Sequence, residues 1–194
     1  EPTVVRSVPR TTWAAEDLSA QRRISNALLY FGSTQHLPMK LLGRIPESGY
    51  QLHFFGRGIT PSVLISTFSD DSLSSFQFFG PYNPENICFL LRYRYVVLYR
   101  PGDTSTNYRF ALPNKLFQGM NAGLSFIVSE NFEEMIETLN NVPGAVFVLK
   151  EGGSIKEAVH ALETTRPSDY CQRILDFSRS LHEKAKLAYL SAIR

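Results

Sequence analysis

The sequence of 194 residues contains only two cysteines, Cys88 and Cys171, and neither has a partner at metal-ligand or redox spacing. Both lie in helical patterns, so we expect two buried, reduced thiols. The sequence has no run of about 18 apolar residues, so it predicts no membrane-spanning helix. The first residues, Glu1-Pro2-Thr3, lack the basic and then apolar order of a signal peptide, which favours a cytoplasmic location.

An excess of charge is also missing, because 20 Lys+Arg oppose 18 Asp+Glu for a net charge of +2. This balance argues against general nucleic-acid binding, which usually needs a clustered basic face, but it leaves room for a local anion site. The four histidines, His36, His53, His160 and His182, have no metal-ligand spacing, so we expect no metal or other cofactor. The absence of GxGxxG and GxxxxGK[ST] motifs argues against a nicotinamide cofactor and a P-loop.

From residue 26 onward, short apolar runs alternate with helical patterns. Strands are predicted over 27–31, 50–55, 76–79, 95–99, 124–128 and 145–149, and helices over 36–45, 61–68, 83–90, 114–121, 132–139, 154–163 and 170–188. This alternation predicts an α/β fold: a single Rossmann-like, doubly wound domain over 26–194, with a mainly parallel six-stranded sheet and a long C-terminal helix. Residues 1–25 are polar and read as a linker from a missing N-terminal domain, since the chain does not begin with methionine.

Ligands of doubly wound sheets bind beyond the carboxyl ends of the strands, where the strand order reverses. Gly32, Ser33 and Thr34 follow the first predicted strand and suit a close phosphate, although a plain turn explains them equally well. Arg57 follows the second strand between two glycines and supplies either a fixed positive charge for an anion or a solvated side chain. Tyr82 follows the third strand and could stack on a nucleobase or pack in the core.

The most informative segment is 107–128, where Pro113 leads directly into a helix with Asn114 and Lys115 in its first turn. A cation is unfavourable there, because the dipole of a helix is already positive at its N-terminus. Lys115 is explained if a diphosphate binds at this helix end, and the alternative is a lysine that points into solvent.

The run LPNKLFQ at 112–118, with NAGL at 121–124 and the strand that follows, resembles the donor-binding motif of retaining GT-B glycosyltransferases of group 1. In that family the segment reads roughly LPNKLFE, then AAGLPVI. The strand ends FG (31–32), LHFFGRG (52–58) and FFGP (78–81) are similar in the same order, and the similarity covers about residues 26 to 165. The resemblance implies the C-terminal, nucleotide-sugar-binding half of a two-domain enzyme, whose acceptor-binding domain comes first in the same parent chain.

The resemblance also implies roles for individual residues. Asn114 and Lys115 would contact the diphosphate or the neighbouring sugar, and Thr104, Ser105 and Thr106 would line the donor site.

Four positions depart from the family or match it loosely. Gln118 stands where the family often has a glutamate that binds the ribose hydroxyls, and Phe110 replaces a second acid. Glu130 is a candidate catalytic residue that would touch the donor sugar, although a solvated helix face also explains it. The basic residue that the family has after its first strand has no clear counterpart, and Lys40 is the nearest.

These patterns predict transfer of a sugar from a nucleotide diphosphate sugar to an acceptor hydroxyl, in polysaccharide or glycoconjugate synthesis. This half alone would bind nucleotide weakly and transfer sugar slowly or not at all. A regulatory or scaffolding domain without donor chemistry is the alternative that Gln118 and Phe110 favour; an epimerase or a flavodoxin-like domain would need acids that are not evident. The basic residues of the last helix (Arg173, Arg179, Lys184 and Lys186) fit either a solvated face or contact with the inner face of an anionic membrane.

Overall fold

The computed structural model describes residues 13–14, 17–18, 23–33, 39–58, 61–83, 86–102, 109 and 114–192. Six strands form one sheet: β1 (Ala27–Phe31), β2 (Gln51–Phe55), β3 (Phe76–Phe78), β4 (Tyr95–Leu98), β5 (Ser125–Val128) and β6 (Val146–Val148). All neighbouring strands are parallel, in the order β3-β2-β1-β4-β5-β6. The predicted Rossmann-like fold is therefore confirmed. The flavodoxin-like alternative, whose strand order is 2-1-3-4-5, is wrong.

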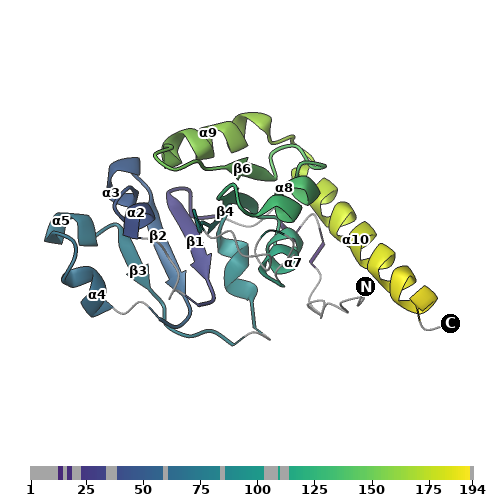
Figure 1. Cartoon of the computed structure of the whole chain (residues 1–194), viewed down its shortest axis with the longest axis horizontal. Helices are drawn as coiled ribbons and strands as arrows, with labels where there is room; N and C mark the ends of the chain where they lie inside the picture. Colours follow the sequence, from purple (N-terminus) through teal and green to yellow (C-terminus); the bar gives the residue numbers. More distant parts are fainter. Residues whose placement is uncertain are drawn as a thin grey trace.

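Helices cover both faces of the sheet (Figure 1). One face carries α2 (Met39–Leu42), α3 (Ile45–Ser48), α4 (Pro61–Ile65), α5 (Asp70–Leu73) and α9 (Ile155–Thr165). The other carries the 3-10 helix η1 (Cys88–Arg92), α7 (Asn114–Asn121), α8 (Glu133–Leu139) and α10 (Tyr170–Ala192). Successive residues of β1 point to opposite faces, so Leu28 and Tyr30 enter one core while Leu29 and Phe31 enter the other.

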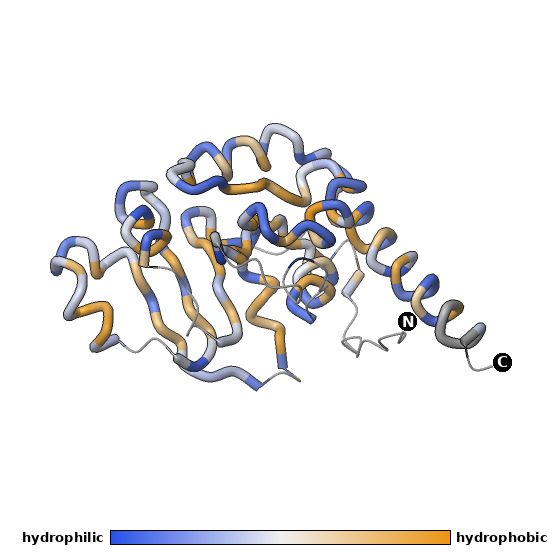
Figure 2. The backbone as a smooth tube through the Cα atoms, in the orientation of Figure 1, coloured by the Kyte–Doolittle hydropathy of each residue, from blue (hydrophilic) through white to orange (hydrophobic). Residues whose placement is uncertain are grey.

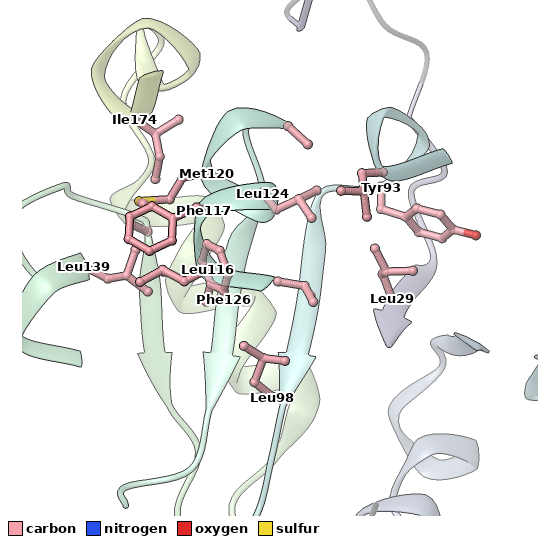
Figure 3. Close-up of a cluster of buried hydrophobic side chains, with 14 of the residues drawn as sticks. Leu29, Tyr93, Leu98, Leu116, Phe117, Met120, Leu124, Phe126, Leu139 and Ile174 are labelled. Atoms are coloured by element: carbon pink, nitrogen blue, oxygen red, sulfur yellow. The ribbon is translucent and has the colours of Figure 1, made fainter. Parts of the chain in front are cut away.

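Both cores are mainly apolar, as expected of a parallel sheet covered on both sides. Figure 2 shows hydrophobic residues concentrated along the strands, while the helices alternate between the two colours. Close to α7, Leu116, Phe117 and Met120 meet Phe126 of β5 and Ile174 of α10 (Figure 3). This packing fixes α7, and with it the first-turn lysine, against the sheet.

The single helix predicted over 36–45 is wrong in its C-terminal part. Residues 36–38 lie outside the described residues, α2 ends at Leu42, and α3 begins at Ile45 with Pro46 in its first turn. A proline lacks the N–H that would bond the carbonyl four residues earlier, so one continuous helix could not pass this point. The helix α5 was not predicted.

The helix expected over 83–90 is also wrong. The structure has instead the short η1 helix, and the start expected at Asn83-Pro84-Glu85 lies partly outside the described residues. The chain must cross from the edge strand β3 past β2 and β1 to reach β4, and extended backbone covers about twice the distance per residue of a helix. One thiol prediction fails here too, because Cys88 is exposed, although both cysteines are free and Cys171 is half-buried.

Both ends of the described chain contact this domain. Leu18 is buried, Trp13 and Ile24 pack against the core beside α7, and Leu18 N donates to Ala14 O (3.2 Å), as in a turn of helix. In α10, Tyr170 and Ile174 are buried, whereas Ala185 is exposed. Among the residues whose burial is described, the apolar side chains of this helix are therefore covered mainly in its first half.

Candidate functional site

Three glycines lie side by side where β1, β2 and β3 end. Phe31 pairs with Phe55 and Phe54 pairs with Phe78, so the residues that follow come into register: Gly32, Gly56 and Gly80. The N–H of Gly32 donates to Phe55 O (2.7 Å), and that of Gly56 donates to Gly80 O (2.8 Å). The carboxyl edge of this half of the sheet is therefore bare backbone.

At two of these positions only glycine fits. Gly56 has a φ of +154°, and a Cβ there would lie 1.8 Å from Gly32 O. Gly32 has a φ of +105°, and a Cβ there would lie 2.5 Å from Cε of Lys115. Glycine alone adopts such angles readily and allows such approaches, so these residues keep the edge open.

Lys115 reaches this edge from the first turn of α7. Its Nζ lies 4.9 Å from the ring centroid of Tyr30 and 5.8 Å from that of Phe31. These neighbouring rings point to opposite faces of the sheet, so an amine close to both lies over the end of β1. Strand order reverses between β1 and β4, and this is where ligands of doubly wound sheets bind.

The charge of Lys115 is poorly compensated. Burial and, to a lesser extent, the positive charge of Arg100 together lower the pKa of its ammonium group to about 8. No carboxylate of the described residues forms an ion pair with Lys115. A partly buried cation without a counter-ion stabilises an incoming anion more strongly than an exposed lysine would.

A hollow of about 340 Å³ lies beside this amine. It is lined by Gly32, Ser33, Gly56, Arg57, Pro81 and Tyr82. The structure thus brings together four of the predicted site residues from three different strand ends (Gly32, Ser33, Arg57 and Tyr82), and Lys115 contacts the first of them.

Two of these residues also have structural roles. Tyr82 packs edge-on against Phe31 (6.1 Å between centroids) and Phe89 (5.3 Å), and burial raises the pKa of its phenol. The carbonyl of Ser33 accepts a hydrogen bond from Tyr30 Oη (2.6 Å). Arg57 is exposed at the rim of the hollow.

Other predicted residues do not line the hollow. Asn114 is exposed on α7 and Gln118 lies one turn further along the same helix. Glu130 is exposed in the turn after β5. The predicted residues Thr34, Thr104, Ser105 and Thr106, and also His36 and Phe110, lie outside the described residues.

Arg100 is a site residue that the sequence did not single out. It is half-buried two residues after the end of β4, and its N–H donates to Ser129 Oγ (2.8 Å). Its charge adds to burial in lowering the pKa of Lys115, and it opposes burial at Tyr30, where burial raises the pKa to about 12. A basic residue immediately after a buried strand was the available signal. Lys40, in contrast, lies on α2 as expected and forms an ion pair with Glu151.

Within the described ranges, no three His, Cys, Asp or Glu side chains are arranged to hold a metal ion. His53 is buried between Tyr93 Oη (2.8 Å from Nδ1) and the side chain of Gln51. None of the helices in the described part of the chain is long and apolar enough to cross a membrane.

Comparison with known proteins finds similarity in structure but not in sequence. No protein-family profile and no curated protein sequence matches the chain. Among solved structures, AviGT4, a glycosyltransferase involved in avilamycin A biosynthesis, superposes with a TM-score of 0.63 at 14% identity, over 93% of this chain and 56% of its own. The chain has the fold of a GT-B glycosyltransferase domain.

Two further structures agree with this glycosyltransferase-like domain. WaaG, a glycosyltransferase involved in lipopolysaccharide biosynthesis, has a TM-score of 0.51 at 16% identity, over 85% of this chain and 44% of its own. TarM has a TM-score of 0.55 at 12% identity, over 85% of this chain and 35% of its own. The chain thus spans about a third to just over half the length of these proteins.

Proposed function

We propose that this chain is the donor-binding half of a glycosyltransferase, which holds a nucleotide diphosphate sugar for transfer to an acceptor hydroxyl. The observation that carries the proposal is the position of the Lys115 amine, over Gly32 at the point where the strand order reverses. A second lobe, supplied by an acceptor-binding domain of the same parent chain, would form the opposite wall of the cleft.

The chemistry of the proposed reaction requires stabilisation of a leaving diphosphate. Fixed cations in a site that is partly shielded from water lower the energy of the charge that develops there, without reorganisation at the moment of reaction. Lys115 and Arg100 supply such cations, and the glycine row lets phosphate oxygens approach the backbone closely. None of the described residues that line the hollow is a carboxylate, which favours a binding role over the acid–base chemistry of an epimerase.

Isothermal titration with UDP, GDP and ADP tests this proposal. The matched variants are Lys115→Met, which keeps the length of the side chain but not its charge, and Lys156→Met on the exposed face of α9. We expect one of the nucleotides to bind, and we expect Lys115→Met to weaken binding about tenfold or more, because a charge-assisted hydrogen bond to phosphate is lost. Lys156→Met should bind as the unmodified chain does.

Two outcomes would reject the proposal: no nucleotide binds at up to about 10 mM, a very weak limit, or Lys115→Met binds as tightly as the Lys156→Met control. Binding of nucleotide without any turnover, after the acceptor-binding half is supplied, would favour the regulatory alternative that Gln118 suggests. Contact with a membrane has less support, because Arg173 forms an ion pair with Asp169, just before α10, and Arg179 forms one with Asp176 of the same helix.

A further inference from the structure

A second concave site lies at the opposite edge of the sheet. Its volume is about 260 Å³, and its lining includes Arg23, Arg94, Arg166, Ser168, Tyr170 and Cys171. Arg94 directly precedes β4, and Arg166 lies in the connection between α9 and α10, two helices labelled in Figure 1. The hollow beside Lys115, here called the Lys115 cleft, lies beyond the carboxyl ends of the strands. The two sites are therefore separated by roughly 13 Å, the length of a four-residue strand.

Arg23 is a fixed charge in this pocket. Its Nη1 donates to Tyr93 O (2.6 Å) and Gly123 O (3.2 Å), and its Nη2 donates to Ala122 O (3.2 Å) and Leu18 O (3.3 Å). Burial lowers the pKa of its guanidinium group, and the charges of Arg166 and Arg94 lower it further. Arginine nevertheless stays protonated in proteins, so the repulsion among the three groups remains until an anion relieves it.

Arg166 and Arg94 retain donors for a ligand. The guanidinium group of Arg166 lies 4.0 Å from the ring centroid of Tyr170 and donates from Nη2 to Gly123 O (3.3 Å). Its Nε and Nη1 form no hydrogen bond with any described residue. Arg94 is exposed, and its side chain has no hydrogen-bond partner in the described ranges.

Neighbouring carboxylates leave this positive charge uncompensated. Glu163 on α9 accepts a hydrogen bond from Tyr95 Oη (2.8 Å), and Asp169 pairs with Nε of Arg173 (2.7 Å). Neither forms an ion pair with the three arginines. The 23-residue helix α10 begins at the same place and adds the positive end of its dipole and N–H groups without intrahelical acceptors.

We propose that this pocket binds a phosphate group, either free or as part of a small phosphorylated molecule, at a site separate from the Lys115 cleft. A guanidinium fork matches two oxygens of a phosphate, and the phosphate carries up to two negative charges, whereas a carboxylate carries one. Three fixed cations and a helix N-terminus therefore favour phosphate over a carboxylate. The proposal does not depend on the glycosyltransferase assignment, since no residue is shared between the two sites.

Titration with inorganic phosphate and glycerol phosphate tests the proposal, in a Lys115→Met background that removes the other anion site. Arg94→Gln is the diagnostic variant, because the Arg94 side chain forms no hydrogen bond or ion pair with the described residues that the substitution would break. The matched control is Arg179→Gln, at an exposed arginine of α10. We expect one of the two ligands to bind at millimolar concentration and Arg94→Gln to weaken it about tenfold.

The stronger ligand of the pair identifies the source, a free ion or a phosphate monoester, and either supports the proposal. Three outcomes would overturn the proposal: neither ligand binds, Arg94→Gln binds phosphate as tightly as Arg179→Gln, or malonate binds as tightly as phosphate.

Cys171 provides a local readout, because its Sγ lies 4.0 Å from Nη2 of Arg166 and it lines the pocket. In a Cys88→Ser variant it is the only cysteine of the sequence. We expect the ratio of the alkylation rate with anionic iodoacetate to that with neutral iodoacetamide to be higher at Cys171 than with free cysteine. Phosphate should slow both reactions, and Arg94→Gln should reduce the preference. Equal relative rates, or labelling that phosphate does not slow, would contradict a phosphate site here.

Discussion

The amine of Lys115 occupies the space that a side chain on Gly32 would need: a Cβ at Gly32 would lie 2.7 Å from Nζ. The two residues come from α7 and from the end of β1, and each limits what the other can be. Glycine leaves room for the long lysine side chain to cross the end of the strand, and the lysine brings its charge to this bare end of β1.

Replacement of Gly32 by alanine should therefore displace the amine as well as strain the backbone. Gly49→Ala is the control, because Gly49 also has a positive φ (+76°) but nothing lies within 4 Å of its Cβ position. We expect Gly49→Ala to lower the free energy of unfolding by about 1 kcal/mol and Gly32→Ala by about 1–3 kcal/mol, measured by urea denaturation. Only Gly32→Ala should also weaken nucleotide binding; equal nucleotide affinities for the two variants would contradict the role of this contact.

Nucleotide affinity should depend on pH through Lys115. Its pKa of about 8 lies below the ordinary value because of burial, and only the protonated amine attracts a diphosphate. Affinity is therefore retained below pH 8 and lost as pH rises through it, by about tenfold between pH 7 and pH 9. Phosphate groups with a second pKa of about 6 are already ionised over this range, so the ligand contributes little.

Titration calorimetry at several pH values measures this dependence. In Lys115→Met the nucleotide affinity should be low and independent of pH. A steep decrease in that variant would assign the titrating group to another residue.

The sequence predicted the sheet well because the information lies in local, continuous apolar runs. All six strands were found, with ends that differ by one residue at most, and the helix over Asn114–Asn121 was predicted with its observed ends. The errors occurred where tertiary geometry decides. The crossover before β4 is not an α-helix, because it must span two strands, and the break between α2 and α3 depends on a proline inside an otherwise helical apolar pattern.

For the site, the sequence predicted residues at strand ends but not their neighbours. Gly32, Arg57 and Tyr82 were found because each follows a predicted strand, whereas their common hollow depends on the register of β1, β2 and β3. Arg100 was missed because its proximity to Lys115 depends on the packing of α7 against the sheet. The arginine pocket was missed for a similar reason, since its three arginines are far apart in sequence.

The packing of α7 can be tested at Gly119, where a Cβ would lie 2.6 Å from Cζ of Phe126. Alanine is a better helix former than glycine by about 1 kcal/mol, so an open site would be stabilised by this change. Here the clash should dominate and lower the free energy of unfolding by about 1–3 kcal/mol. Adding Phe126→Leu should recover part of the loss made by Gly119→Ala. Gly43→Ala, where the nearest atom is at 3.7 Å, should be close to neutral; a stabilised Gly119→Ala variant would show that α7 is not held this tightly.

Arg23 stabilises the fold through its hydrogen bonds to carbonyls and destabilises it through repulsion from Arg94 and Arg166. We expect the hydrogen bonds to contribute the larger free energy. Arg23→Met retains the apolar stem but removes the donor to the carbonyls of Leu18, Tyr93 and Ala122, whereas Gly123 O still accepts from Arg166. An unpaired buried polar group costs about 1–3 kcal/mol. The relief of repulsion among the three arginines recovers a smaller free energy, because water screens charges near the surface.

We therefore expect Arg23→Met to lower the free energy of unfolding by about 2–4 kcal/mol in urea denaturation. Arg92→Met, at an exposed arginine in η1, should change it by less than about 0.5 kcal/mol. Phosphate should stabilise the unmodified chain more than Arg23→Met, since the substitution removes one of the three cations that attract it. An Arg23→Met chain as stable as Arg92→Met would show that the hydrogen bonds of Arg23 contribute little to the stability of the fold.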